Sequence, residues 1–198
     1  PAGWPETHPE FIIRRSTFRH NDVSAYDGSA IYVDGRSLGN PRRVVIEDCL
    51  FEDNAQDRHG LGYPDIGGGG AFAIATYNAA YEVEITRTTF RNNQGTPASA
   101  LRFFDWVPGQ PLRAVLTDVQ VYGGRPLPYP SEVELDNLAI DIADTTWRVE
   151  FNNVDLGTGA DANPYPQFGG CWSDITGILD GMVLDLTERP GVRCPWRP

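Results

Sequence analysis

The feature that most limits the folds open to this chain is an internal repeat. A pattern of one aliphatic residue, four intervening residues and a phenylalanine occupies residues 13–18, 46–51 and 85–90, and weaker copies occupy residues 116–121 and 151–156. The motif keeps its length while the spacing between copies varies, so the insertions between copies are expected in loops. A motif that returns at periods of about 30 to 40 residues is typical of stacked repeat architectures.

A second pattern follows the first four copies of the motif. It consists of a small residue and an alternating apolar run, in residues 30–33, 71–74, 100–103 and 139–142. The runs lack the 3.6-residue period of a helix, and no Asn-Gly hairpin turn separates them from their neighbours. Each unit is therefore predicted to contain two or three short strands and to form one coil of a solenoid.

The strand motif can be tested by comparing equivalent positions, because stacked parallel strands place equivalent residues about 4.8 Å apart. Two positions before the final residue of each motif, every side chain is small or β-branched: Ser16, Cys49, Thr88, Val119 and Val154. Such a column predicts an inward-facing position. Cys49 is therefore expected to be a buried small side chain and not a reactive thiol.

Two further columns alternate in charge from one unit to the next. Three positions before the final residue of the motif are Arg15, Asp48, Arg87, Asp118 and Asn153, and one position after it are Arg19, Glu52 and Arg91. Alternation of this kind predicts ion pairs between neighbouring strands. Three positions after the motif are Asn21, Asn54 and Asn93, which predict a ladder of side-chain amides at a turn.

An Ile-x4-Phe-x2-Asn strand followed by a Gly-Gly-Ala turn resembles the repeat of the right-handed parallel β-helix family, which includes pectate lyases and many bacterial surface proteins. The resemblance is clearest in residues 46–54 with 67–71 and in residues 85–93. It implies an all-β fold, a right-handed parallel β-helix of about five coils. Residues 1–156 would form the N-terminal lead-in and the coils, and residues 157–198 the last coil and a Pro/Gly-rich C-terminal cap.

The lyase branch of this family implies calcium held by outward carboxylates and an arginine that removes a proton beside a uronate carboxylate. The candidates are Arg87 and Arg102 as the base and Glu47, Asp48, Glu82 and Glu84 as calcium ligands. Arg87 also belongs to the alternating column with Asp48 and Asp118, and a structural ion-pair ladder is the preferred explanation for it. The signature motifs of lyases and polygalacturonases are missing, so the sequence assigns no catalytic residue.

Aromatic residues in the predicted loops are the best candidates for a binding surface. The insertions are predicted at residues 55–69, 104–112, 122–132 and 157–170. They contain Tyr63, Trp106 and Tyr129, which would stack on sugar rings if the loops line up on one flank. The alternative is that these side chains pack down over the coils as covers.

Cysteine usage bears on the compartment. Three cysteines are too few for a disulfide framework and lack the spacing of a metal site. Cys171 and Cys194 both lie in the Pro/Gly-rich C-terminal region, where a disulfide between them is expected. A disulfide would favour an exported protein, located outside the cell or on its surface.

Charge excludes two classes of partner. The chain has 16 basic residues, all of them arginine, against 27 acidic ones, for a formal net charge of −11. Such a chain has no polybasic segment to exchange for the counterions of nucleic acid or to bind an anionic lipid surface. No apolar stretch is long enough for a membrane-spanning helix, so membrane insertion is not expected either.

Two functions fit these patterns. The first is a non-catalytic extracellular or cell-surface protein with a structural or adhesive role, which stacks end to end or joins a longer assembly. Its partner would be a polysaccharide or another protein subunit, and it would pair Arg15, Arg87 and Arg91 between coils. The second is a carbohydrate-active enzyme, either a polysaccharide lyase or a glycosidase. No cofactor is expected, apart from the calcium that a lyase would use.

Overall fold

The chain folds as an all-β protein. The computed structural model describes residues 10–23, 28–34, 43–56, 70–77, 80–95, 98–107, 112–124, 138–142, 147–156, 168–170, 174–179 and 182–187. These residues form eighteen strands and contain no helix. Accordingly, the described part holds no helix of the length and apolarity that crossing a membrane requires.

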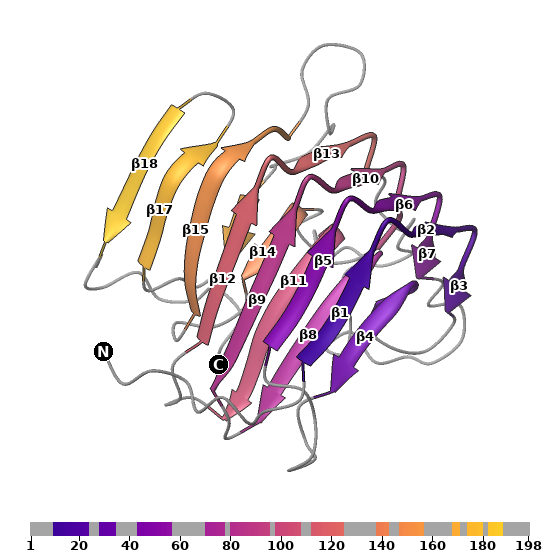
Figure 1. Cartoon of the computed structure of the whole chain (residues 1–198), viewed down its shortest axis with the longest axis horizontal. Coiled ribbons are helices and arrows are strands. Elements are labelled where there is room, and N and C mark those ends of the chain that lie inside the picture. Colours follow the sequence, from indigo (N-terminus) through magenta and orange to yellow (C-terminus); the bar gives the residue numbers. More distant parts are fainter. Residues whose placement is uncertain are drawn as a thin grey trace, which may run out of the picture.

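The largest sheet has seven strands in the order β1-β5-β9-β12-β15-β17-β18 (Figure 1). Its strands are β1 (Glu10–Arg14), β5 (Arg43–Glu47), β9 (Tyr81–Thr86), β12 (Leu112–Thr117), β15 (Trp147–Val154), β17 (Asp174–Leu179) and β18 (Met182–Thr187). All neighbours are parallel except β17 and β18, which are antiparallel.

Three smaller sheets take up the strands between those of the large sheet. The four-stranded sheet contains β2 (Thr17–Arg19), β6 (Leu50–Glu52), β10 (Thr89–Arg91) and β13 (Gln120–Tyr122). The five-stranded sheet contains β4 (Ile31–Asp34), β8 (Phe72–Tyr77), β11 (Ala98–Val107), β14 (Leu138–Ile142) and β16 (Phe168–Gly170), and β3 (Asp22–Val23) pairs with β7 (Ala55–Gln56). The chain therefore visits the large, the four-stranded and the five-stranded sheet in the same order in each of its first four repeats.

The register confirms the predicted columns. In the four-stranded sheet Phe18 pairs with Phe51, Phe51 with Phe90, and Phe90 with Val121. The three phenylalanine rings stack with centroids 4.8 Å apart and interplanar angles of 9° and 11°. The aliphatic starts of the motif are also in register, from Ile13 to Ile46 and onward through the large sheet. Equivalent residues therefore lie above one another, as the repeat requires.

The hydrophobic core lies between the sheets. In β9 alternate residues point into it, since Tyr81, Val83 and Ile85 are buried while the residues between them are half-exposed. The second sequence pattern supplies the opposite wall, where Phe72 pairs with Ile31 on one side and with Leu101 on the other. These alternating runs are therefore inward-facing strands, as predicted.

The corners between sheets use single residues with left-handed backbone. After strands β1, β5, β9 and β12 of the large sheet, φ is between 46° and 54° at Arg15, Asp48, Arg87 and Asp118, and φ is 58° at the equivalent Asn153 near the end of β15. After the strands of the four-stranded sheet, φ is between 52° and 65° at His20, Asp53, Asn92 and Gly123. Asp, Asn and Gly tolerate this conformation best, which explains why most of the corner residues are of these types.

The glycine that ends the predicted Gly-rich turn is close-packed. A Cβ atom on Gly70 would lie 2.4 Å from the backbone oxygens of both Gln94 and Ser99. No side chain fits that space without moving the backbone of the next repeat. The turn before Ala71 therefore has a packing role at Gly70, as expected, and the preceding glycines lie outside the described residues.

The structure corrects the predicted loop boundaries. Residues 104–107 belong to strand β11, so Trp106 lies on a strand and not in the insertion predicted at 104–112. Phe104 and Asp105 pair with Ala75 and Thr76 of β8, and a register shift follows before Val107. The pairing with β8 explains the extension. Strands β7, β13 and β16 likewise occupy the ends of the other three predicted insertions.

Candidate functional site

The outer face of the large sheet carries a ladder of alternating charge. Register places Arg43 between Glu10 and Glu82, and Arg113 beside Glu82. Arg43 Nη1 lies 2.6 Å from a carboxylate oxygen of Glu10, and its Nη2 lies 2.8 Å from Glu84 Oε2. Arg113 Nη1 lies 2.9 Å from Glu82 Oε1. Arg43 therefore links β1 to β9 across its own strand β5, and Arg113 contacts Glu82 on the neighbouring strand β9.

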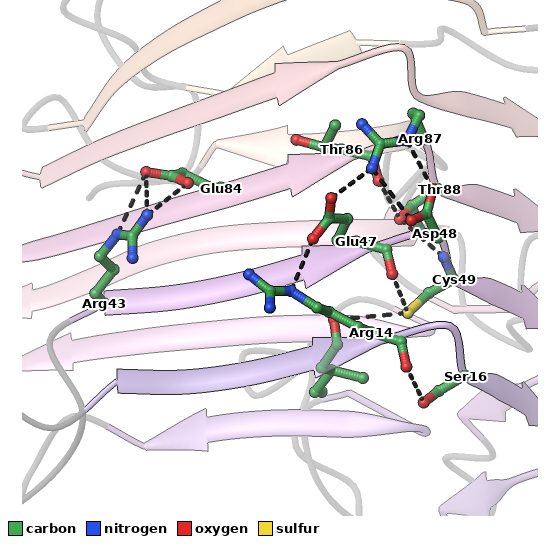
Figure 2. Close-up of polar contacts among 11 residues, drawn as sticks. Arg14, Ser16, Arg43, Glu47, Asp48, Cys49, Glu84, Thr86, Arg87 and Thr88 are labelled. Carbon is green, nitrogen blue, oxygen red and sulfur yellow. Dashed lines mark hydrogen bonds and ion pairs between the residues drawn. The ribbon is translucent and has the colours of Figure 1, made fainter.

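Arg87 lies at the corner after β9 and contacts two carboxylates of the preceding repeat (Figure 2). Its Nε and Nη2 donate to the two carboxylate oxygens of Asp48 at 2.7 and 3.1 Å, and Nη2 also contacts Glu47. Glu47 is held from the other side by Arg14 Nε at 2.7 Å. Three consecutive repeats are thus linked through Arg14, Glu47 and Arg87.

These contacts stabilise the charged forms of the paired groups. Hydrogen bonds that Arg87 donates to Asp48 and Glu47 raise the pKa of Arg87, and hydrogen bonds that Arg43 donates to Glu84 and Glu10 raise the pKa of Arg43. The hydrogen bond from Arg87 lowers the pKa of Asp48. An arginine can remove a proton from a substrate only after losing its own, and a raised pKa opposes that step. The arrangement suits ion pairing better than base catalysis.

A second charged group lies at the ends of strands β2, β6 and β10 in the four-stranded sheet. Glu52 is buried, and its carboxylate contacts Arg19 of the preceding repeat and Arg91 of the following one. Arg19 Nε lies 2.7 Å from Glu52 Oε2. A buried carboxylate is tolerated when cations and hydrogen bonds compensate for the lost water. The predicted alternating column is therefore a set of real ion pairs.

An amide ladder runs beside this column. Asn54 is fully buried, and its Oδ1 accepts hydrogen bonds from the backbone N–H and the side-chain Nδ2 of Asn21, at 3.2 and 2.8 Å. Asn54 Nδ2 donates to Asn93 Oδ1 at 2.9 Å and to the Phe18 carbonyl at 3.1 Å. Asn93 repeats the pattern by donating to the Phe51 carbonyl at 3.0 Å. The predicted asparagine ladder is confirmed.

The column that contains Cys49 is also repeated in its chemistry. Ser16 Oγ and Thr88 Oγ1 each donate to the carbonyl two residues earlier, at 2.9 and 3.0 Å, and Cys49 Sγ lies 3.2 Å from the carbonyl of Glu47 (Figure 2). Cys49 is a free and buried thiol. Its prediction as a structural side chain agrees with this setting.

The candidate lyase residues do not gather into one centre. Glu47, Asp48 and Arg87 form one cluster, whereas Glu82 and Glu84 contact Arg43 and Arg113 elsewhere on the same face. Arg102 lies on β11 of the five-stranded sheet, in register with Asp141. No group of three or more His, Cys, Asp or Glu side chains in the described ranges is placed to hold a metal ion.

The remaining candidates fall mostly outside the described residues. Tyr63 and Tyr129 lie there, and so do Cys171 and Cys194, the two members of the predicted disulfide. Trp106 is placed only by its backbone, on β11. The binding surface and the disulfide therefore stay predictions.

The sequence contained one ladder that the comparison of columns missed. Eight positions before the final residue of each motif stand Glu10, Arg43, Glu82, Arg113 and Arg148. The register stacks these residues in one row on the outer face of the large sheet. Extending the column comparison five residues upstream would have revealed it. Arg15, in contrast, was expected to pair but has no ion pair with a described carboxylate, and acts on Asp48 only through space.

Acid should weaken the fold through these pairs. The folded-state pKa of Asp48 is lowered by Arg87, and that of Glu150 is lowered by Asn152 and then Arg113. The ionised carboxylates of Asp48 and Glu150 therefore stabilise the fold at pH values above their unfolded-state pKa of about 4. This stabilisation is lost as the pH falls through their lowered folded-state pKa values. We expect the urea midpoint to fall from about pH 5 downward. Asp48→Asn should flatten this decline.

The matched control is Asp53→Asn, at an exposed corner where no ion pair with a described residue is present. Its urea midpoint should follow the same pH dependence as that of the wild type. An Asp48→Asn variant that lost stability in acid as steeply as the wild type would contradict the role assigned to the Arg87 pair.

Comparisons of the chain with protein families, with curated proteins and with solved structures give no match.

Proposed function

We propose that this chain is a right-handed parallel β-helix with a structural or adhesive role outside the cell or on its surface. The support for the helix is the repeated passage of the chain through three sheets, with parallel neighbours and stacked equivalent residues. Repeat folds of this kind serve many functions, so the role has to be argued from the side chains.

The observation that carries the proposal is the pairing of the arginines. Arg87 and Arg91, which a lyase would leave free in a groove, contact carboxylates of the neighbouring repeat. Arg14, Arg43 and Arg113 are likewise paired with carboxylates of neighbouring repeats. A surface of this kind stabilises strand stacking and offers a substrate few unsatisfied groups.

The edge of the first repeat supports a role in assembly. Phe11 and Ile12 on β1 are 38% and 43% exposed, although Phe11 belongs to the inward-facing column that is buried in the next repeat. Exposed edge strands with apolar side chains favour pairing with another strand. Association with another protein subunit, end to end, is the proposed mode.

A carbohydrate-active enzyme is the second candidate, favoured by the concentration of arginine and carboxylate side chains on one sheet face. Calcium bound by Glu47, Asp48, Glu82 or Glu84 would have to displace the arginines that contact them. The assay that separates the two candidates incubates the full chain with uronate polymers, with and without calcium. The proposal expects no unsaturated product, and clear product formation would overturn it.

A further inference from the structure

The first repeat ends the stack in all four sheets. Strands β1, β2, β3 and β4 each lie at the edge of their sheet, and no other described strand covers them (Figure 1). We propose that this edge binds a parallel β-strand of another protein subunit with the sequence acid-x-x-aromatic-acid-x-Asn. The inference rests on the proposed structural function and names the chemistry of its partner.

Charge at the edge specifies the two acids. Arg15 and Arg19 occupy the two alternating columns of the first repeat, and in the second repeat the same columns hold Asp48 and Glu52. Arg91, the described interior cation of the second column, meets Glu52 of the preceding repeat. A strand added before the first repeat would therefore need acids at these positions, because like charges directly opposite destabilise a sheet.

The aromatic and amide stacks specify the other two positions. Phe51 has a ring stacked on each side, by Phe18 and by Phe90, whereas Phe18 has a described ring partner only on the Phe51 side. The Oδ1 atoms of Asn54 and Asn93 each accept two N–H groups from the preceding repeat. Asn21 Oδ1 has no described donor. An incoming aromatic ring and an incoming asparagine would supply what both stacks lack.

The backbone sets the direction of the incoming strand. The N–H of Leu50 donates to the carbonyl of Ser16 in the preceding repeat, and the N–H of Thr89 donates to that of Cys49. In the first repeat the equivalent donor is Thr17, which lies on the uncovered side. The same hydrogen-bond pattern is completed only by a strand parallel to β2.

A second copy of this chain does not offer that strand at its other end. Past β10, the first acidic position holds Asp118, but the aromatic, second acidic and asparagine positions hold Val121, Tyr122 and Gly124. The large sheet also ends in the antiparallel strand β18. The required chemistry occurs instead in the second repeat, residues 43–54, where it already covers the far side of the first repeat. A separate strand of this chemistry is therefore the occupant that the edge fits.

The test uses a fluorescent peptide with the sequence of residues 43–54, in which Cys49→Ser prevents oxidation, titrated with the full chain in an anisotropy assay. We expect saturable binding. Reversing both acids in the peptide, Asp48→Arg with Glu52→Arg, should weaken binding at least tenfold. Absence of saturable binding by the unmodified peptide, or equal binding by the reversed one, would overturn the inference.

A charge swap identifies the site. Arg15→Asp in the protein should weaken its binding of the unmodified peptide. The same variant should bind a peptide that carries only Asp48→Arg more tightly than the wild-type protein does. Asp48 and Asp118 occupy the same corner with positive φ, so aspartate fits the backbone there. Swap variants that leave both affinities unchanged would place the peptide elsewhere and contradict the inference. If the peptide does not bind, the inference about the edge is overturned, and the uronate assay still tests the structural function separately.

Discussion

Replacing Asn54 by alanine should lower the free energy of unfolding by about 3 to 5 kcal/mol. The substitution removes four hydrogen bonds, two accepted from Asn21 and two donated to Asn93 and to the Phe18 carbonyl. Each net hydrogen bond is worth about 1 kcal/mol, and leaving a buried group unsatisfied costs about 1 to 3 kcal/mol. Urea unfolding followed by far-UV circular dichroism measures the change.

The control is Asn21→Ala, at the end of the same ladder. Asn21 is half-buried and donates one side-chain hydrogen bond, to Asn54 Oδ1. Its loss should cost about 1 kcal/mol, because one exposed-end bond is removed and water can replace it. Equal losses in the free energy of unfolding for Asn54→Ala and Asn21→Ala would contradict the stabilising role assigned to the buried hydrogen bonds of Asn54.

Replacing Phe51 by alanine should cost about 3 to 5 kcal/mol, the usual range for truncating a fully buried phenylalanine. The side chain is 0% exposed and lies between the rings of Phe18 and Phe90. The truncation would open a cavity and remove two aromatic stacking contacts at once. The urea midpoint at constant denaturant slope is the measurement.

Two variants calibrate this result. Phe51→Leu keeps most of the volume and should cost clearly less than the alanine variant. Phe18→Ala removes a half-buried ring with one described stacking partner and should also cost less. A Phe18→Ala variant as destabilised as Phe51→Ala would mean that the edge ring is covered as fully as the central one.

The stacked columns were predictable because a parallel repeat places equivalent residues in contact. The asparagine ladder and the Glu52 pairs follow directly from positions counted from each phenylalanine. Glu10 and Arg43 are stacked in the same way, but they lie upstream of the repeated six-residue motif. The sequence did not show that the strands begin that far upstream.

Other features depended on information that one sequence lacks. Strand β11 runs through Trp106 because Phe104 and Asp105 find partners on β8, a long-range pairing that local composition does not encode. The antiparallel direction of β18 cannot be told from its apolar pattern, because parallel and antiparallel strands share the same two-residue alternation. The ion pair expected at Arg15 is not formed with a described residue, and its column neighbour Asp48 pairs with Arg87.

The central claim is that the arginines of the outer face hold the repeats together. The most direct test measures uronate cleavage and the urea midpoint in the same Arg87→Ala preparation, beside the wild type and Arg102→Ala. We predict a lower midpoint for Arg87→Ala, since Glu47 and Asp48 lose their shared cation, and no unsaturated product from any of the three proteins. Cleavage by the wild type that disappears in Arg87→Ala at an unchanged midpoint would contradict the claim.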